Sequence, residues 1–343
     1  MIRRAVRLLV FLAPVLVLSG VAAQQPPAAV RSPEVASDRR VTFRLGAPKA
    51  ADVQLTCECF TGAKPLQKDD KGIWSLTVGP VEPDIYEYEF SVDGVTVTDP
   101  RNPAVKYNSR PSPASSLLDV PGASPMFYDV REVPPGYERG SSRLPVLYLL
   151  HGADGDDSSW SWFGRAPQIL DNLIADKKMT PMVVVMPFGY AHPPAGAVAA
   201  DRQRADFEKD LLQDIIPYVQ ANYRVRTDRD SRALVGLSMG GGQALNIGLR
   251  RLDTFSRVAA FSGAVPRDAA TSFKGMRIPA GSLKLLWLGC GTEDSLLAPN
   301  REFSGFLKAT GVAHTFKETS GAHTWIVWRR YLQEVAPQLF PQT

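Results

Sequence analysis

The composition of this 343-residue chain, with 44% hydrophobic and 22% charged residues, is that of a soluble globular protein and allows one large domain or two of ordinary size. Lys and Arg outnumber Asp and Glu by 39 to 35, but three of the arginines lie among the first seven residues, so residues 24–343 are nearly balanced in charge. No run or stripe of Lys and Arg stands out, which argues against a nucleic-acid partner.

The first 23 residues have the three parts of a secretory signal peptide. Three arginines form a basic start, an apolar run extends to Leu18, and small residues end at Ala23. A membrane anchor is the alternative, but the apolar run is short for a span and no basic stop-transfer segment follows. We therefore expect cleavage after Ala23, a periplasmic or secreted protein with no stable membrane insertion, and a flexible linker over residues 24–38.

Short alternating strands separated by Gly, Pro and Asp turns fill residues 39–108 and predict a small all-β, immunoglobulin-like sandwich. In "YEYEFSVDG" the rings of Tyr86, Tyr88 and Phe90 share one face of a strand. Aromatic rings can also stack on sugars, but strict alternation favours the inward face and therefore the core. The following segment, residues 109–124, is rich in Pro and Ser and predicts a linker.

The three cysteines are an odd number for an exported protein. Cys57 and Cys59 lie two apart on a predicted strand, so their side chains point the same way along it, and Cys290 ends an apolar strand as a small buried side chain. The chain contains no C-x-x-C or H-E-x-x-H motif. We expect no disulfide framework, no metal site and no cofactor.

Residues 125–343 alternate between predicted strands and helices. Apolar segments such as "LPVLYLLHG", "PMVVVMPFG" and "LKLLWLGCG" are typical of strands buried on both faces, and "ADFEKDLLQDIIPYVQANY" is typical of a long amphipathic helix. Repeated strand–helix units predict a mainly parallel sheet flanked by helices, the α/β class.

A candidate nucleophile lies in "GLSMG", a G-x-S-x-G pattern between a predicted strand and a predicted helix. Glycines relieve crowding at so tight a turn, and the turn exposes the hydroxyl of Ser238. A serine needs a base, and the base needs an orienting carboxylate. The order Ser, acid, His leaves His314 and His323 as candidate bases. His314 opens a predicted strand and so lies at the wrong edge of the sheet, which favours His323, with a helix cap as the structural alternative. Glu293 and Asp294 both follow the preceding strand and either could serve as the acid; the shorter Asp294 is our choice, with Glu293 as the fallback.

Two backbone amides are needed to bind an oxyanion during acyl transfer. The amide of Met239 directly follows the candidate nucleophile, and that of Ala153 lies in the loop after the first long strand. Trp160 and Trp162 in the same loop are candidate substrate contacts, although packing beneath the loop explains them equally well. His151 precedes the nucleophile in the chain and is expected to brace this loop.

With these residues placed, the chain resembles carbohydrate esterase family 1, the exported feruloyl and acetylxylan esterases, whose α/β-hydrolase fold is shared with esterase D and enterochelin esterase. The resemblance therefore implies an α/β-hydrolase fold for residues 125–343. The phrases that carry the resemblance are "PVLYLLHGADGDDSSW", "LVGLSMGGGQALNIGL", "LWLGCGTEDSLL" and "SGAHTWIVWRRYL". Residues 39–108, including "TDPRNPAVKYN", are similar to the glycogen-branching-enzyme-like (CBM48-type, E-set) module often fused to these enzymes. The resemblance implies the roles of nucleophile for Ser238, acid for Asp294 and base for His323.

The resemblance implies hydrolysis of feruloyl or acetyl esters on plant cell-wall polysaccharide such as arabinoxylan, with a polysaccharide or a small aromatic ester as the binding partner. An enterochelin-esterase-like hydrolase of siderophore or short-chain esters is the enzymatic alternative. A glycan-binding protein with an inactive hydrolase domain is the non-enzymatic alternative. Relatives carry a β-hairpin that is missing here around residues 130–143, which predicts an exposed sheet edge and altered domain docking. Nothing in the sequence indicates an oligomeric state.

Overall fold

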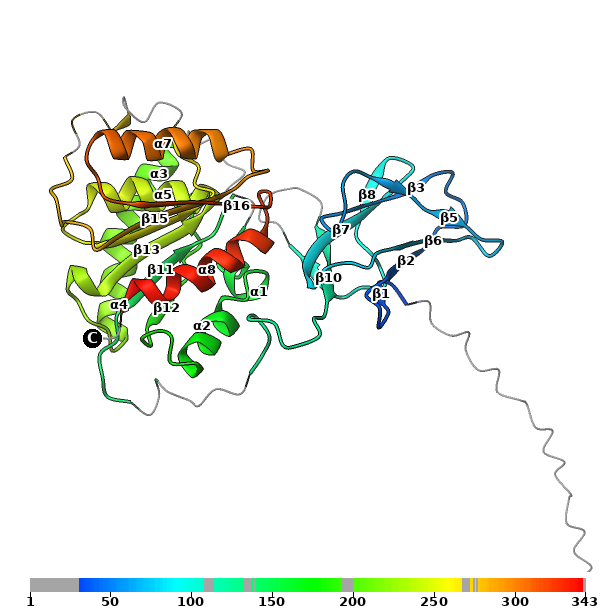
Figure 1. Cartoon of the computed structure of the whole chain (residues 1–343), viewed down its shortest axis with the longest axis horizontal. Helices are drawn as coiled ribbons and strands as arrows, with labels where there is room; N and C mark the ends of the chain where they lie inside the picture. The colour runs from blue at the N-terminus through cyan, green and yellow to red at the C-terminus, as the bar shows by residue number, and fades with distance from the viewer. Residues whose placement is uncertain are drawn as a thin grey trace, which may run out of the picture.

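The computed structural model describes residues 31–107, 114–131, 137, 140–153, 155–192, 200–266, 272, 273, 275 and 277–341. The predicted signal peptide, and the predicted linker up to residue 30, lie outside this range. The described chain forms an N-terminal all-β domain beside a larger α/β domain (Figure 1). Within the described residues, no helix combines the length and the apolar character that crossing a membrane requires.

The N-terminal domain is a sandwich of two antiparallel sheets, which we call the sandwich. One sheet has the order β1-β2-β6-β5 and the other β4-β3-β7-β10-β9, with β8 paired to β7. The strands are β1 (Glu34–Val35), β2 (Val41–Gly46), β3 (Val53–Cys57), β4 (Lys64–Pro65), β5 (Gln67–Lys68), β6 (Ile73–Val78), β7 (Asp84–Val92), β8 (Val95–Val97), β9 (Val105–Lys106) and β10 (Ser115–Val120). Residues on the inner faces of both sheets form one core.

The aromatic residues of β7 lie in this core, as their alternation predicted. Tyr86, Tyr88 and Phe90 are all buried, and the Tyr88 ring packs edge-on against Phe43 at 4.9 Å between ring centres. Trp74 is also buried and donates its indole N–H to the carbonyl of Ala47. These rings therefore hold the two sheets together and do not offer a sugar-stacking surface.

The sandwich is longer than residues 39–108. β10 lies inside the segment predicted to be a linker, residues 109–124, yet it pairs along five residues with the central strand β7. Ser116, Leu118 and Val120 alternate inward from it, and the surrounding Pro and Ser hid this short pattern. β1 likewise lies within 24–38, where Ser32 donates a hydrogen bond of 2.5 Å to Asp99. Both predicted linkers were therefore wrong in part.

Cys57 and Cys59 form a disulfide, which corrects the expectation of none. β3 ends at Cys57, and the chain turns immediately afterwards instead of continuing as a strand. The turn brings the two Cα atoms to 5.2 Å, within the range that a disulfide spans. Cys290 is free and buried, as predicted.

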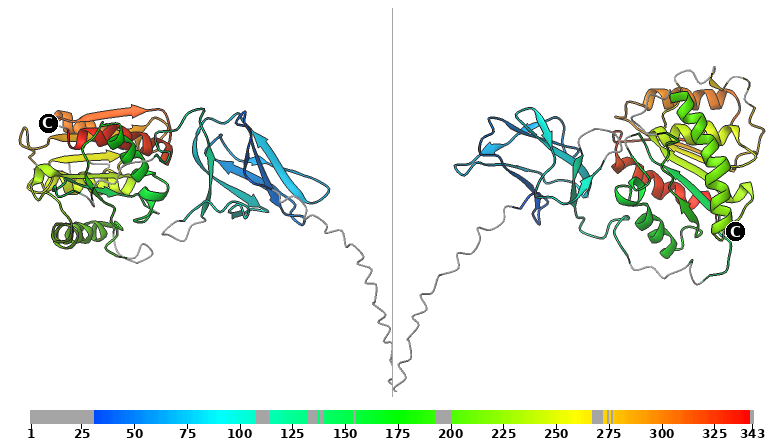
Figure 2. Two further views of the ribbon diagram at one scale, coloured as in Figure 1. Left: turned by 90° about the horizontal axis from the view of Figure 1, so that it is seen from below. Right: turned by 180° about the vertical axis from the view of Figure 1, so that it is seen from behind.

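The α/β domain contains a six-stranded parallel sheet in the order β12-β11-β13-β14-β15-β16. Its strands are β11 (Val146–Leu150), β12 (Val183–Val185), β13 (Arg232–Leu237), β14 (Arg257–Phe261), β15 (Leu285–Gly291) and β16 (Thr315–Thr319). The right-hand view of Figure 2 shows helices on both sides of this sheet. This arrangement agrees with the predicted mainly parallel sheet flanked by helices.

Helices cover both faces of this sheet. One face carries α1 (Ser159–Trp162), α2 (Ala166–Ala175) and α8 (Trp325–Leu339). The other carries α3 (Ala200–Lys209), α4 (Ile216–Asn222), α5 (Ser238–Arg250) and α7 (Leu297–Ala309). A π-helical segment, Asp210–Ile215, joins α3 to α4 within the stretch predicted as one regular helix, and a 3₁₀ turn, Arg229–Ser231, precedes β13. Pro217 follows the π segment and cannot donate the next helical hydrogen bond.

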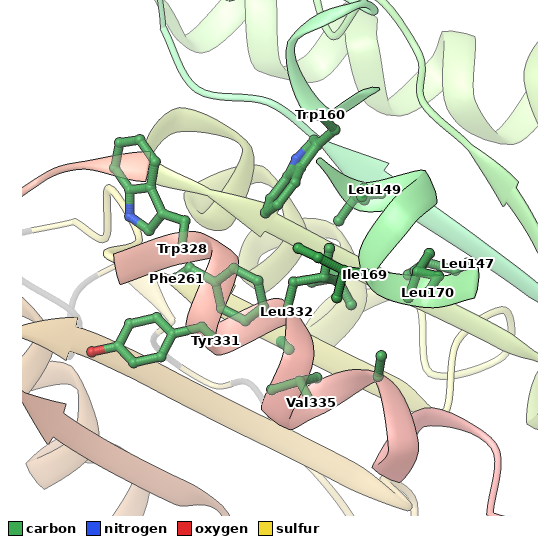
Figure 3. Close-up of a cluster of buried hydrophobic side chains, with 14 of the residues drawn as sticks. Leu147, Leu149, Trp160, Ile169, Leu170, Phe261, Trp328, Tyr331, Leu332 and Val335 are labelled. Carbon is green, nitrogen blue, oxygen red and sulfur yellow. The ribbon is translucent and has the colours of Figure 1, made fainter. Parts of the chain in front are cut away.

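Trp160 belongs to the core between α8 and the sheet, together with Phe261 and Leu332 (Figure 3). Only 1% of Trp160 is exposed, and its indole N–H donates to the carbonyl of Leu150 at 2.9 Å. The proposal that Trp160 contacts substrate was therefore wrong, and the packing alternative is correct. A ring of this size fills the space beneath the loop that follows β11.

The two domains share their cores. Ile85 of β7 and Leu117 of β10 pack into the core beneath α8, and Ile326 of α8 packs against the sandwich core. The first turn of α8 therefore lies against the sandwich, and Figure 1 shows β7 and β10 facing the start of this helix.

β12 is an edge strand of the sheet in the described part of the chain. An apolar hollow of about 710 Å³, whose lining includes Val183 and Tyr218, lies between β12 and α4. Much of the segment where the hairpin is missing lies outside the described residues. Leu144, which directly follows this segment, forms an isolated β-bridge with Val225.

Candidate active site

Ser238 occupies a tight turn between β13 and α5. Its backbone is left-handed, with φ at 51°. A Cβ atom on Gly236 would lie 2.4 Å from the carbonyl carbon of Gly240, and one on Gly240 would lie 2.4 Å from the carbonyl oxygen of His151. Because real Cβ atoms do not approach so closely, both positions require glycine. The local sequence thus builds the sharp strand-to-helix turn that the G-x-S-x-G pattern predicts.

His323 lies between Ser238 and Asp294. Its Nε2 atom is 2.9 Å from the Ser238 Oγ atom, and its Nδ1 atom is 2.8 Å from an Asp294 carboxylate oxygen. Ser238 follows β13, Asp294 follows β15 and His323 follows β16. The carboxyl ends of these three parallel strands therefore bring the residues to one edge of the sheet. The structure therefore joins all three predicted side chains in one hydrogen-bonded series.

The Asp294 carboxylate is completely buried and well supplied with donors. Desolvation raises its pKa, but hydrogen bonds from His323, the Leu296 amide and the Ser262 hydroxyl outweigh this effect, and the pKa of Asp294 is lowered below its ordinary value. The carboxylate is therefore ionised beside the imidazole. Burial, and then the nearby Asp294 carboxylate, raises the pKa of the Cys290 thiol to about 12, so this thiol stays neutral.

Ser262 connects the carboxylate to α8. It follows β14 with a left-handed backbone (φ 48°), and its hydroxyl accepts a hydrogen bond of 3.1 Å from the indole N–H of Trp328. The Trp328 ring packs edge-on against the imidazole of His323 at 4.8 Å between ring centres. Ser262 therefore interacts with Asp294 and Trp328 packs against His323, and sequence reasoning missed both.

Glu293, the fallback acid, points elsewhere. Its carboxylate accepts hydrogen bonds from the amide of Gly321 and the hydroxyl of Thr292. These bonds lower the pKa of Glu293 and tie the loop after β15 to the loop that carries His323. Glu293 positions a loop, whereas Asp294 contacts the imidazole.

Two other histidines, His151 and His314, make contacts with other parts of the α/β domain. His151 is buried, and its ring nitrogens lie 2.7 Å from the carbonyl oxygen of Gly152 and 2.5 Å from that of Phe188, so it braces the loop after β11 as expected. His314 contacts Ser304 at the start of β16, away from Ser238. Within the ranges that the structure describes, no group of three or more His, Cys, Asp or Glu side chains could hold a metal ion.

A cavity of about 260 Å³ lies in front of the Ser238 hydroxyl. Its lining includes Ala153, which the oxyanion prediction named, and the preceding Gly152, where a Cβ would lie 3.1 Å from that of Ser238. Met239 directly follows Ser238 in the first turn of α5. Trp162 is exposed and is not among the lining residues.

Sequence reasoning missed most of this cavity wall. The remaining lining residues are Gly155, Ser159, Leu237, Thr324, Trp325 and Trp328 of the α/β domain and Glu87, Lys106 and Ser115 of the sandwich. The "HTW" phrase after the base could have suggested Trp325, but no sequence signal connects the sandwich residues to Ser238. They reach the cavity only because the two domains dock.

Residues 128–339 match the family profile described as "Putative esterase". The chain belongs to this esterase family. The match covers the α/β domain and includes all three residues of the hydrogen-bonded series. As a member, the chain is classed with the carboxylic ester hydrolases.

Two esterases match different shares of this chain. It is 30% identical to an endo-1,4-beta-xylanase/feruloyl esterase of Xylanibacter ruminicola, over 90% of this chain but only 46% of that protein. Thus the chain spans about half the length of this relative. A CE1 ferulic acid esterase structure from Anaeromyces mucronatus is 25% identical over 57% of this chain and 78% of its own, with a TM-score of 0.50.

The fold of both domains recurs in a third protein. The enterobactin esterase of Shigella flexneri, crystallised in the presence of 2,3-dihydroxy-N-benzoyl-glycine, superposes with a TM-score of 0.67 over 88% of this chain and 92% of its own. At 19% identity this likeness concerns the fold alone.

Proposed function

We propose that this esterase is a serine hydrolase in which Ser238, His323 and Asp294 form the catalytic triad. The observation that carries the proposal is the position of the His323 imidazole, within 2.9 Å of the Ser238 hydroxyl on one side and 2.8 Å of the buried Asp294 carboxylate on the other. This geometry suits a base that is oriented by an acid and poised to activate a hydroxyl. It argues against the alternative of a glycan-binding protein with an inactive hydrolase domain.

In this mechanism the Ser238 Oγ atom attacks the ester carbonyl carbon while His323 Nε2 takes the hydroxyl proton. Asp294 stabilises the resulting imidazolium. The tetrahedral intermediate then collapses, the bond to the alcohol oxygen breaks, and His323 returns the proton to that oxygen. Water repeats the sequence on the acyl-enzyme and releases the carboxylic acid.

The amides of Met239 and Ala153 are the proposed oxyanion donors. Met239 lies in the first turn of α5, where unpaired helical N–H groups and the helix dipole favour negative charge. Ala153 lines the same cavity as Ser238. Two donors that flank the attacked carbonyl stabilise the oxyanion more than the planar ester.

The proposed substrates are feruloyl or acetyl esters on plant cell-wall polysaccharide such as arabinoxylan. The feruloyl esterase names of two relatives support the acyl group. The cavity of about 260 Å³ lies just below the range of roughly 300–1,000 Å³ usual for drug-sized ligands, which favours a single acyl ester over a macrocyclic trilactone. Hydrolysis of siderophore or other short-chain esters remains the competing substrate class.

The remaining parts of the proposal concern export and the sandwich. The basic and apolar start of the chain supports a cleaved signal peptide and a periplasmic or secreted location. The two antiparallel sheets support an immunoglobulin-like sandwich of the CBM48 type. We include both in the proposed function.

The test is turnover of 4-nitrophenyl acetate, methyl ferulate, feruloylated arabinoxylan, acetylated xylan and enterobactin by the wild type and by Ser238→Ala. We expect release of ferulate or acetate by the wild type and a loss of about 10⁴-fold or more in kcat for the variant. Equal rates for the two proteins on every ester would overturn the proposal. Turnover of enterobactin alone would select the competing substrate class.

A further inference from the structure

Three strands of the sandwich deliver polar side chains to the Ser238 cavity. Glu87 lies on β7, Lys106 on β9 and Ser115 on β10, and all three line the cavity together with Ser238. In the sheet, Leu117 is opposite Glu87 and Ser115 is opposite Lys106. Because directly paired residues, and residues two apart on one strand, project from the same face of a sheet, these side chains share one face. It is the face that packs against the α/β domain, since Leu117 enters the core beneath α8.

Glu87 and Lys106 form an ion pair on this face. The Lys106 Nζ atom is 2.6 Å from one Glu87 carboxylate oxygen, and each side chain is only 20% exposed. The Glu58 carboxylate accepts a hydrogen bond from the Glu87 amide and fixes this point of β7. Partial burial of two charges has a desolvation cost that a simple ion pair recovers poorly. A pair retained at the wall of a reactive cavity is therefore a candidate for ligand binding.

The position of the Glu87–Lys106 pair in the cavity indicates which half of the ester it would contact. His323 returns a proton to the leaving alcohol, so the cavity wall beyond the imidazole faces the alcohol half. Thr324 and Trp325, the next residues in the chain, line the cavity together with His323. From Trp325 the aromatic contacts continue to Phe163, at 6.2 Å between ring centres, and Lys106 Nζ lies 6.0 Å from the Phe163 ring centre. The pair is thus linked to the segment that carries the proposed base, and we place the alcohol half of the ester on this side.

We propose that Glu87 and Lys106 form a subsite for the alcohol half of the ester and that its ligand is a neutral, polyhydroxylated sugar residue. This inference rests on the proposed function. The ammonium keeps N–H groups that can donate to sugar oxygens, the carboxylate can accept from sugar hydroxyls, and the Ser115 hydroxyl can do either. An anionic alcohol would meet the Glu87 carboxylate. A simple alkyl alcohol would desolvate the pair without replacing its contacts with water.

The test compares two esters with the same acyl group. Lys106→Met and Glu87→Gln are measured with methyl ferulate and with a feruloylated arabinoxylo-oligosaccharide. We expect kcat/KM for the oligosaccharide ester to fall about tenfold to hundredfold, and kcat/KM for methyl ferulate to change less than about threefold. Glu89→Gln is the matched control, because Glu89 lies on the same strand and the same face but does not line the cavity. It should leave both values unchanged.

A binding measurement separates this inference from the proposed function. In a Ser238→Ala background, the affinity for the same feruloylated oligosaccharide is measured by calorimetry with and without Lys106→Met. We expect the substitution to weaken binding about tenfold or more, even if the wild type hydrolysed neither ester. Unchanged affinity would overturn the subsite. An equal loss of kcat/KM for both esters would also overturn it, since that result indicates displaced domains.

Discussion

Arg329 of α8 donates a hydrogen bond of 2.6 Å to Asp84 of β7, and the two side chains, 245 residues apart in the chain, are 1% and 2% exposed. Asp84 also accepts a hydrogen bond of 2.5 Å from Arg330, and Arg329 donates to the carbonyl of Phe163. Because α8 begins two residues after His323, the proposed base, this buried ion pair fastens the sandwich to the segment that carries His323.

Replacing Asp84 by Ala is expected to destabilise the protein by about 3–5 kcal/mol, since it leaves the Arg329 guanidinium buried without its charge partner. Urea unfolding at pH 7 measures this change. The double variant Asp84→Leu, Arg329→Met removes both charges and should recover most of the loss. A stability of Asp84→Ala within about 1 kcal/mol of the wild type would show that this ion pair does not hold the domains together.

Asp294→Asn is expected to reduce kcat about 10⁴-fold with little change in fold, because an amide cannot stabilise the imidazolium and favours the wrong imidazole tautomer. Glu293→Gln is the matched control: it changes the adjacent acid, which contacts Gly321 and Thr292 instead of His323. The control should keep kcat within about tenfold of the wild type. Steady-state kinetics on one chromogenic ester distinguishes the two, and the reverse ranking would make Glu293 the acid.

Ser262→Ala is expected to lower both activity and stability. It removes a hydroxyl that hydrogen-bonds Asp294 and leaves the Trp328 indole N–H without its acceptor, at a cost of about 1–3 kcal/mol in unfolding free energy. The part due to Asp294 depends on pH. Because the native pKa of Asp294 is lowered, its ionised form contributes stability that is present above the unfolded pKa and is lost as pH falls through the native value.

The difference in stability between wild type and Ser262→Ala should therefore shrink between neutral and acid pH, as measured by urea unfolding at pH 7 and pH 3. Ser256→Ala is the control, since Ser256 is equally buried at the other end of β14 and donates to the carbonyl of Arg229. It should lose stability with kcat unchanged. If both serine variants lost the same fraction of kcat, a positioning role for Ser262 would be untenable.

The series Ser238, Asp294 and His323 could be placed from sequence because each residue follows an apolar strand of a parallel sheet. The carboxyl ends of such strands meet at one edge, so strand order in the chain was enough to bring distant residues together. The same argument distinguished His323 from His314, which precedes its strand. Asp294 and Glu293 could not be separated in this way, because adjacent loop residues differ only in which way the turn directs their side chains.

The features that sequence missed depend on contacts between segments with weak local signals. β10 has only six residues between prolines, and its place is decided by pairing with β7. The disulfide between Cys57 and Cys59 depends on where β3 stops, and strand ends are the least certain boundary in a pattern. Glu87 and Lys106 occupy strand positions that, from sequence alone, are expected to face solvent. They line the cavity only because the two domains dock.

Gly240 is expected to tolerate no side chain. A Cβ there would lie 2.4 Å from the carbonyl oxygen of His151 and 2.7 Å from the Leu150 Cβ atom, so Gly240→Ala must push α5 away from the loop after β11. We expect a loss of at least about 1–3 kcal/mol in unfolding free energy. We also expect a large fall in kcat, because Ser238 and Ala153 lie on the two segments that separate.

Gly305→Ala is the matched control, since Gly305 lies in the exposed part of α7 with no atom within 4 Å of the position of a Cβ. Alanine is a better helix former than glycine, so this variant should gain about 0.5–1 kcal/mol and keep wild-type kcat. Chemical unfolding and ester turnover of the two variants together test the crowding at the elbow. If Gly240→Ala were as stable and as active as Gly305→Ala, the close approach of α5 to His151 could not be what holds Ser238 in place.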